Sequence, residues 1–246
     1  MQRVDPETSL RVPDTPVEVR FHARHPWAIL PYKVKVDQGA ARERASLYAQ
    51  EFRWLRANRV PELCWPWRLG AELGWVVPSP VDVTFTPLGE TEVDPEAEDL
   101  ALLGDITGAA ELWRRERAAF AIPRAPWLRL HQYRVGDAWH AMFLPNGAGA
   151  AEWHLGWDVE IPEGTFLLVM PGPAISGLEV PMGVLDRRAL VRAREGEGMS
   201  IAVRPGTTAE VRRGDPVARL VLLDAKSLTA KAVFEPAPPI SSSEEG

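Results

Sequence analysis

Residues 160–225 read EIPEGTFLLVMPGPAISGLEVPMGVLDRRALVRAREGEGMSIAVRPGTTAEVRRGDPVARLVLLDA. The short apolar runs of this stretch are separated by the turn-forming groups Pro-Glu-Gly, Pro-Gly, Arg-Pro-Gly and Arg-Arg-Gly-Asp. The same pattern begins after residue 126, with Gly-Asp and Pro-Asn-Gly groups. Turn residues at this spacing are typical of the short strands of a sandwich or barrel. The C-terminal half is therefore predicted to be a β structure.

Four segments of this stretch resemble, in their order along the chain, the motifs of the dUTPase/dCTP deaminase β-clip fold. They are 161–164 (IPEG), 176–178 (SGL), 183–186 (GVLD) and 214–220 (GDPVARL). The resemblance implies a C-terminal β-clip or jelly-roll-like barrel of the dUTPase kind. It also implies one candidate function, a dUTPase-like nucleotide pyrophosphatase, in which Asp186 would position the attacking water on a magnesium-bound triphosphate.

The chain departs from the dUTPase pattern where that family binds its nucleotide. Arg188 and Ala189 stand where the family has a second Asp and a Tyr, and Ile175 stands where an arginine precedes Ser-Gly. The spacing from Ser176 to Gly183 is shorter, and the C-terminus is rich in Pro and Ser instead of carrying the Gly-rich phosphate-binding motif. Since a fold does not imply a function, these departures favour a shared fold over a shared activity.

A second resemblance covers most of residues 58–224 and is to an uncharacterised bacterial family known only as a domain of unknown function. It implies no activity, and most of its matching residues are of structural types, because glycine and proline fix turns. The matching residues are Pro61, Glu62, Leu63, Cys64, Gly74, Trp75, His154, Gly156, Gly214 and Pro216.

The composition limits the classes of protein to which the chain can belong. It has 246 residues, of which 46% are hydrophobic, a formal net charge of −6 and a pI near 5.5. An acidic chain lacks the broad positive field of most nucleic-acid-binding proteins, and no stretch approaches the roughly 20 apolar residues of a membrane-spanning helix. The single cysteine and the polar N-terminus give no sign of a disulfide framework or a secretory signal. We expect a cytoplasmic, globular protein with neither a nucleic-acid nor a membrane partner.

The N-terminal half is predicted to combine two helices with irregular segments. Residues 1–16 are expected to form an extended arm, followed by a strand at 17–21. A helix is predicted from Gly39 to about Asn58, because its apolar side chains recur three and four residues apart. The sequence 61–87 is broken by proline and glycine into turns, and is expected to be irregular until it enters a strand at 81–85.

Two further segments complete this half. The acidic stretch 89–106 is interpreted as a solvated loop in preference to a cation site. A second helix is predicted at 109–120, with Thr107 as its possible cap. The domain boundaries that follow are an arm at 1–16, an N-terminal part at 17–126, a β core at 127–235 and a disordered tail at 236–246, together forming one compact domain.

The segment 128–144 (LRLHQYRVGDAWHAMFL) predicts a β-hairpin if Gly136 and Asp137 form its two-residue turn. Counting outward from that turn pairs Tyr133 with His140 and His131 with Met142. All four side chains then share one face of the hairpin, since side chains alternate along a strand. His131, Tyr133 and His140 are therefore candidate catalytic acid or base groups.

The histidines of this hairpin could also hold a metal. Diagonal cross-strand neighbours such as His131 and His140 lie about 7 Å apart, and His154 is the natural third ligand. Such a site would suit a divalent Fe, Zn or Mg ion in hydrolytic or oxidative chemistry. The alternative is that each histidine satisfies its own hydrogen bonds, and a register shift of one residue would separate the pair.

The sequence thus indicates an α+β, mainly β protein with a C-terminal barrel resembling dUTPase and an N-terminal part containing two helices. The predicted function is that of a bacterial enzyme of small-molecule metabolism with a histidine-containing pocket, with or without a metal. Two alternatives stay open, the dUTPase-like pyrophosphatase that uses Asp186 and a non-catalytic ligand-binding or assembly module. A homo-oligomer, dimer or trimer, is possible.

Overall fold

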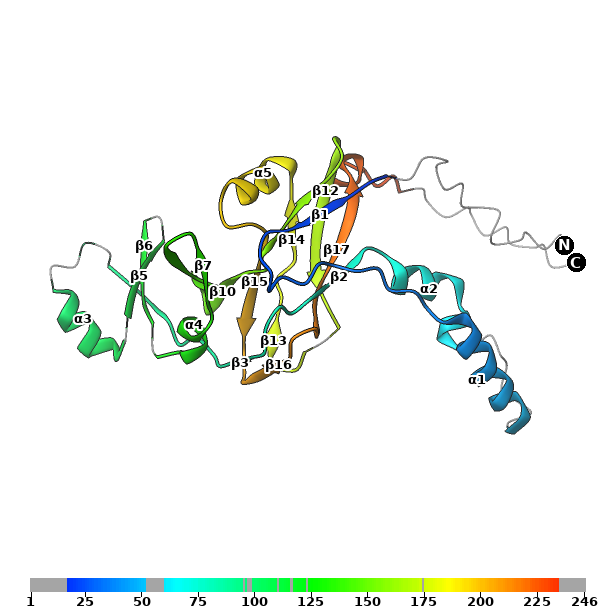
Figure 1. Ribbon diagram of the computed structural model, residues 1–246, viewed down its shortest axis with the longest axis horizontal. Coiled ribbons are helices and arrows are strands. Elements are labelled where there is room, and N and C mark those ends of the chain that lie inside the picture. The colour runs from blue at the N-terminus through cyan, green and yellow to red at the C-terminus, as the bar shows by residue number, and fades with distance from the viewer. Residues whose placement is uncertain are drawn as a thin grey trace, which may run out of the picture.

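The computed structural model describes residues 17–51, 60–94, 96, 99–109, 111–115, 117–122, 124–173 and 175–234. The chain is mainly β, with two four-stranded antiparallel sheets at its centre (Figure 1). Most of the described strands lie in the C-terminal half, as the turn pattern predicts. The predicted arm at 1–16 and tail at 236–246 lie outside the described residues.

The first sheet contains two of the four segments that resemble the β-clip motifs, those at 183–186 and 214–220. Its order is β14 (Gly183–Leu185), β12 (Thr165–Pro171), β17 (Pro216–Asp224) and β2 (Trp75–Pro78). The central strand β12 pairs with β14 on one side and with β17 on the other, and its alternating burial directs Leu167 and Val169 into the core.

The second sheet supplies the other half of the hydrophobic core. Its order is β13 (Leu178–Glu179), β15 (Ser200–Pro205), β10 (Ala150–His154) and β9 (Phe143–Gly147). Trp153 and Phe143 are fully buried, and each meets Phe85 edge to face with ring centroids 5.5 Å apart, while their own rings are tilted with centroids 5.2 Å apart. Buried residues of both sheets form one continuous cluster.

Short strand pairs complete the body around these two sheets. They are β1 (Arg20–Ala23) with β11 (Trp157–Glu160), and β3 (Val83–Phe85) with β16 (Ala209–Val211). The strand predicted at 17–21 thus begins three residues later than expected. Within the described ranges, every sheet has an open strand order.

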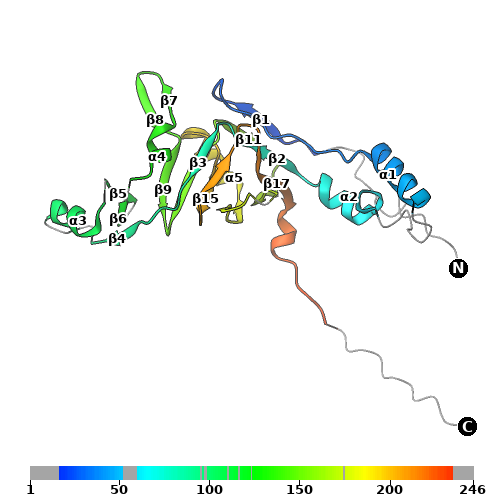
Figure 2. The same cartoon turned by 90° about the horizontal axis from the view of Figure 1, so that it is seen from below.

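Helices lie at the periphery. The predicted first helix is confirmed as α1 (Gln38–Glu51), and its expected continuation to Asn58 lies outside the described residues. The segment predicted to be irregular instead forms a 3-10 turn at Pro61–Leu63 and the helix α2 (Trp65–Glu72). The guanidinium of Arg219 stabilises the end of α2 by donating hydrogen bonds to three of its last carbonyl groups at 2.9–3.1 Å. Figure 2 shows α1 and α2 on one side of the central sheets.

The predicted helix at 109–120 is wrong, and so is the loop assigned to 89–106. The strands β5 (Glu111–Arg115) and β6 (Ala118–Ile122) form a hairpin that β4 (Thr91–Val93) extends. The helix of this region, α3 (Leu100–Thr107), lies upstream, with Asp99 as its N-cap and Gly108 as its left-handed C-cap. Trp113 and Phe120 are cross-strand partners rather than neighbours on one helical face. The described part of the chain before residue 126 therefore holds three α-helices rather than two.

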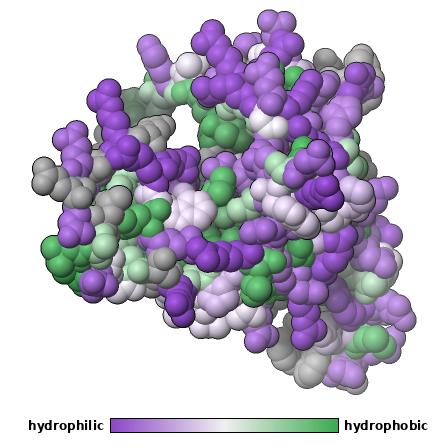
Figure 3. Space-filling model, turned by 60° about the vertical axis from the view of Figure 1, so that its left-hand side comes forward, coloured by the Kyte–Doolittle hydropathy of each residue, from purple (hydrophilic) through white to green (hydrophobic). Residues whose placement is uncertain are grey.

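On the face drawn in Figure 3, hydrophilic side chains predominate and hydrophobic ones show in separate patches. Within the described residues, no helix is long and apolar enough to cross a membrane. The remaining helices, α4 (Pro126–Leu130) and α5 (Arg187–Glu195), flank the residues that form the candidate site.

Candidate functional site

The predicted hairpin is confirmed, and it supplies two side chains of the site. Strands β7 (Gln132–Val135) and β8 (Ala138–Ala141) are joined by a turn in which Gly136 has a φ of 59°. Tyr133 is the cross-strand partner of His140, as counting from the turn predicts. Their rings stack with centroids 5.8 Å apart and planes inclined by 23°.

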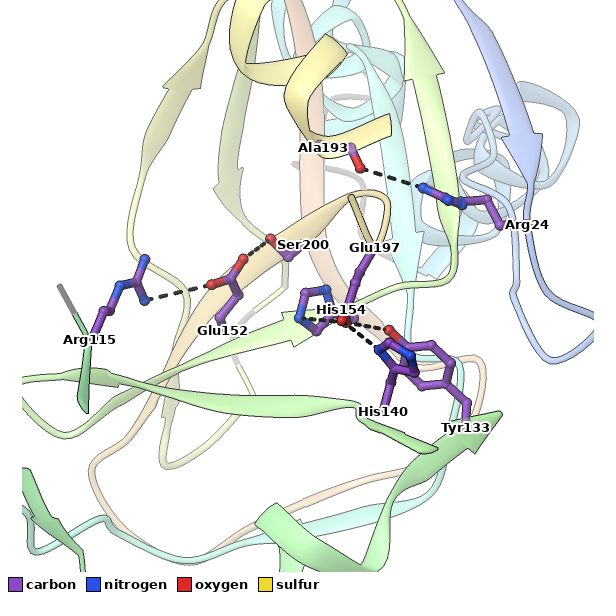
Figure 4. Close-up of polar contacts among 9 residues, drawn as sticks. All are labelled: Arg24, Arg115, Tyr133, His140, Glu152, His154, Ala193, Glu197 and Ser200. Carbon is purple, nitrogen blue, oxygen red and sulfur yellow. Dashed lines mark hydrogen bonds and ion pairs between the residues drawn. The ribbon is translucent and has the colours of Figure 1, made fainter. Parts of the chain in front are cut away.

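Glu197 is the centre on which these side chains converge (Figure 4). The hydroxyl of Tyr133 donates to Glu197 Oε2 at 2.7 Å, and His140 Nδ1 lies 2.7 Å from Glu197 Oε1. Both carboxylate oxygens are thus engaged by the same hairpin. Because a carboxylate only accepts hydrogen bonds, His140 presents Nδ1–H to it, and in the neutral form of the ring the lone pair is then on Nε2.

A tight turn after α5 holds Glu197 in place. Glu197 lies between Gly196 and Gly198, and Gly198 has a φ of 91°. A Cβ at Gly198 would lie 3.0 Å from the carbonyl oxygen of Trp157, so the turn depends on glycine for both conformation and space. The Gly-Glu-Gly at 196–198 is the sequence signal for this residue, which our sequence analysis missed.

His154 closes the inner side of the site. It ends β10, is only 6% exposed, and its Nε2 lies 3.6 Å from Glu197 Oε2. Neither of its ring nitrogens has a hydrogen-bond partner within the described part of the chain. A buried imidazole with unpaired nitrogens is costly, so we expect a buried water to complete the hydrogen bonds of His154.

The charge states follow from these contacts. Burial by itself would raise the pKa of Glu197, but the hydrogen bonds from Tyr133 and His140, together with the nearby His154 and His140 charges, outweigh it and lower that pKa. The pKa of Tyr133 is raised, first by burial and then by its hydrogen bond to the Glu197 carboxylate. Near neutral pH the site therefore contains an ionised carboxylate and a neutral phenol.

A segment from the N-terminus forms the adjoining wall. His25 stacks on Trp27 with centroids 5.2 Å apart and planes 4° from parallel, and both rings lie about 5 Å from that of Tyr133. Burial, and then the positive charges of Arg24 and His140, lower the pKa of His25. Gly156 permits this arrangement, since a Cβ there would lie 2.5 Å from the Trp27 ring. His25 was not among the residues predicted for the site.

His131, the third predicted catalytic group, lies apart from this cluster. The register holds, because Met142 N donates to the His131 carbonyl at 3.0 Å. However, His131 caps the C-terminal end of α4, and its ring meets Phe143 edge-on and lines a different cavity. The alternation of a regular strand therefore does not reach residue 131. Of the three predicted catalytic groups, only Tyr133 and His140 lie at Glu197.

The described residues do not fit the predicted metal centre. Among them, no group of three His, Cys, Asp or Glu side chains is arranged to hold a metal ion. His140 uses Nδ1 on Glu197, and His131 faces elsewhere. The assignment of His131, His140 and His154 as ligands of Fe, Zn or Mg stays a prediction, and no reaction step is derived from a metal.

Asp186 has a local structural role. It follows β14 and is the N-cap of α5, with its Oδ1 accepting a hydrogen bond from Ala189 N at 2.7 Å. The chain continues from it as the helix α5. Asp186 and Glu197 thus flank α5 at its two ends.

Comparisons with known proteins give a likeness to solved structures. No family model and no curated protein matches the sequence. The similar solved structures include an aspartate-to-asparagine mutant of the dUTPase from phage phi11 of S. aureus, with 10% identity, 92% of this chain and 97% of that chain covered, and a TM-score of 0.36. That structure is described as revealing the coordination of a structural Mg(II) ion in the phage protein.

Proposed function

We propose that the protein is a small-molecule enzyme in which His140 acts as a general base oriented by Glu197. The observation that carries the proposal is the Glu197 carboxylate, which accepts hydrogen bonds of 2.7 Å from both Tyr133 and His140. A carboxylate behind an imidazole fixes its tautomer and stabilises the imidazolium that forms when it takes a proton.

The proton transfer would occur at His140 Nε2. The His140 side chain is 31% exposed, so this nitrogen can meet a water molecule or an acidic group of a substrate. Tyr133, held neutral by burial and by its bond to Glu197, keeps the carboxylate from rotating away from the imidazole. His154 is buried on the inner side of Glu197, with its Nε2 3.6 Å from Oε2, and so acts on the carboxylate rather than on the substrate. Hydrolysis of a small polar molecule is the reaction class that suits a base held in this way.

A substrate screen tests this proposal. Purified full-length protein would be assayed with activated esters, amides, lactones, phosphoesters and nucleoside triphosphates, with and without added divalent metal. For any substrate that is turned over, we expect His140→Gln and Glu197→Gln to lose about 10²- to 10⁴-fold in rate, the usual contribution of a positioned base. His22→Gln is the matched control, because His22 is an exposed histidine beside Glu160. Unchanged turnover in both site variants would remove the proposal.

A nucleotide pyrophosphatase of the dUTPase type is the second candidate. Its support is the sheet in which β14 and β17, which carry two of the resembling segments, flank β12, with Asp186 directly after the end of β14. Asp186→Asn tests it cleanly, since Asn caps a helix about as well as Asp but carries no charge. Turnover of dUTP with magnesium that Asp186→Asn abolishes would favour this candidate over the His140 reaction.

The barrel architecture, the oligomeric state and the cellular location are also proposals. The β-clip barrel, a dimeric or trimeric state and a cytoplasmic location are compatible with either enzyme. A non-catalytic binding or assembly module is the remaining alternative. Light scattering of the purified protein, combined with a substrate screen that finds no turnover, would favour that module.

A further inference from the structure

A cavity lies away from Glu197, between α4 and the strand pair β3–β16. Its volume is about 640 Å³, within the range of about 300–1,000 Å³ that small organic ligands occupy. Figures 1 and 2 both show α4 beside β3. The His131 ring, which the acid–base site does not use, is one of its lining groups.

The floor of this cavity is the outward face of the β3–β16 pair. Thr84 and Glu210 are cross-strand partners, and both are exposed between buried neighbours. Side chains alternate along a strand, so Arg212 follows Glu210 on the same face two residues on. Asp82 lies at the entry of β3, where its Oδ1 accepts a hydrogen bond from Arg213 N at 2.8 Å. Opposite charges thus stand next to each other on the floor.

The other wall is apolar. Pro126, Trp127 and Leu130 of α4 line the cavity, and Leu130 is 75% exposed. The indole of Trp127 has its N–H already bound to the Thr86 carbonyl at 3.1 Å, so it offers only its hydrocarbon surface. Burial lowers the pKa of His131, with the nearby Asp82 charge opposing that effect in part. The imidazole is therefore a neutral donor or acceptor near pH 7.

The cavity has a guanidinium and two carboxylates on one side and an apolar wall on the other. From this arrangement we infer that it binds a free α-amino acid with an apolar side chain. Arg212 would take the carboxylate, for which a planar guanidinium is suited, and Glu210 and Asp82 would take the ammonium. The ligand side chain would lie along Leu130 and Pro126. The side chains of Glu210 and Arg212 have no hydrogen-bond or ion-pair partner within the described ranges, so they are available to a ligand.

Calorimetric titration of the full-length protein at pH 7 tests the inference with L-leucine, L-methionine and L-phenylalanine. The charge requirement is tested with L-phenylalaninamide, which lacks the carboxylate, and with 3-phenylpropionate, which lacks the ammonium. We expect each single-charge analogue to bind about tenfold or more weakly than L-phenylalanine, because one charge-assisted hydrogen bond is lost. The inference would be overturned if the analogues bound as tightly as L-phenylalanine. It would also be overturned if no amino acid gave a heat of binding at a concentration of roughly 10 mM.

Two variants locate the binding. Arg212→Gln should abolish the preference for L-phenylalanine over L-phenylalaninamide. Glu210→Gln should abolish the preference for L-phenylalanine over 3-phenylpropionate. Arg188→Gln and Glu163→Gln are matched controls, since both residues are exposed and lie outside the cavity. NMR should show L-phenylalanine shifting the Cε1–H signal of His131 and leaving that of His140 in place. A shift at His140 instead, or unchanged selectivity in both cavity variants, would place the ligand elsewhere and refute the inference.

Discussion

Replacing Gly156 by alanine probes the wall that the N-terminal segment builds beside Glu197. Gly156 has a φ of 76°, and an added Cβ would lie 2.5 Å from the ring of Trp27. A non-glycine residue in this conformation costs about 1–2 kcal/mol. Overpacking against a ring held in place adds about 1–3 kcal/mol. We therefore expect Gly156→Ala to lower the free energy of unfolding by about 2–5 kcal/mol.

Gly164→Ala separates the two contributions. Gly164 has almost the same φ, 73°, but nothing lies within 4 Å of the position of its Cβ. Urea unfolding of both variants should therefore show a loss of about 1–2 kcal/mol for Gly164→Ala and a clearly larger loss for Gly156→Ala. NMR signals of His25 should move only in Gly156→Ala, because Trp27 stacks on that ring. Equal losses in the two variants would refute the contact between Trp27 and Gly156.

Three further predictions concern pH and stability. The pKa of Glu197 is lowered in the folded state from 4.5, so its stabilising contribution is present above that pH and is lost on acidification; the stability difference between wild type and Glu197→Gln should shrink as the pH of urea unfolding falls below 4.5. The pKa values of His25 and His131 are lowered from 6.5, so stability should fall as the pH drops below 6.5, and replacing both with Gln should reduce that slope. Arg219→Gln should cost about 1.5 kcal/mol or more in thermal or urea unfolding, because the last carbonyl groups of α2 lose a charged donor; an unchanged stability would show that water replaces it.

Local patterns accounted for the parts of the fold that could be predicted. The glycine turn at 136 set the hairpin register and with it the pairing of Tyr133 with His140. The apolar spacing after Gly39 identified α1. The helix predicted at 109–120 failed, because Trp113 and Phe120 lie at a spacing that suits a helical face as well as a cross-strand pair. Tertiary pairing with β4 decided between the two.

Only the part of the candidate site that depends on local sequence could be predicted. Tyr133 and His140 are neighbours through a two-residue turn, so their proximity follows from the sequence. Glu197 reaches them across 64 and 57 residues, and His25 meets Tyr133 from the opposite end of the chain. No local signal specifies such contacts. His131 was placed wrongly beside His140, because periodicity does not reveal that α4 ends at residue 130 and breaks the alternation.

The sequence by itself determined that residues 160–225 contain strands divided by glycine and proline turns, because those residues impose turns through their own backbone preferences. It did not reveal the helix α5 within them. It also determined which side chains the hairpin pairs. Only the tertiary structure decided that the turn at 196–198 brings Glu197 onto that hairpin and that His131 faces a separate cavity. The physical reason is that Glu197 and His140 are distant in sequence, so they meet only because the packing of the sheets brings the turn at 196–198 next to the hairpin.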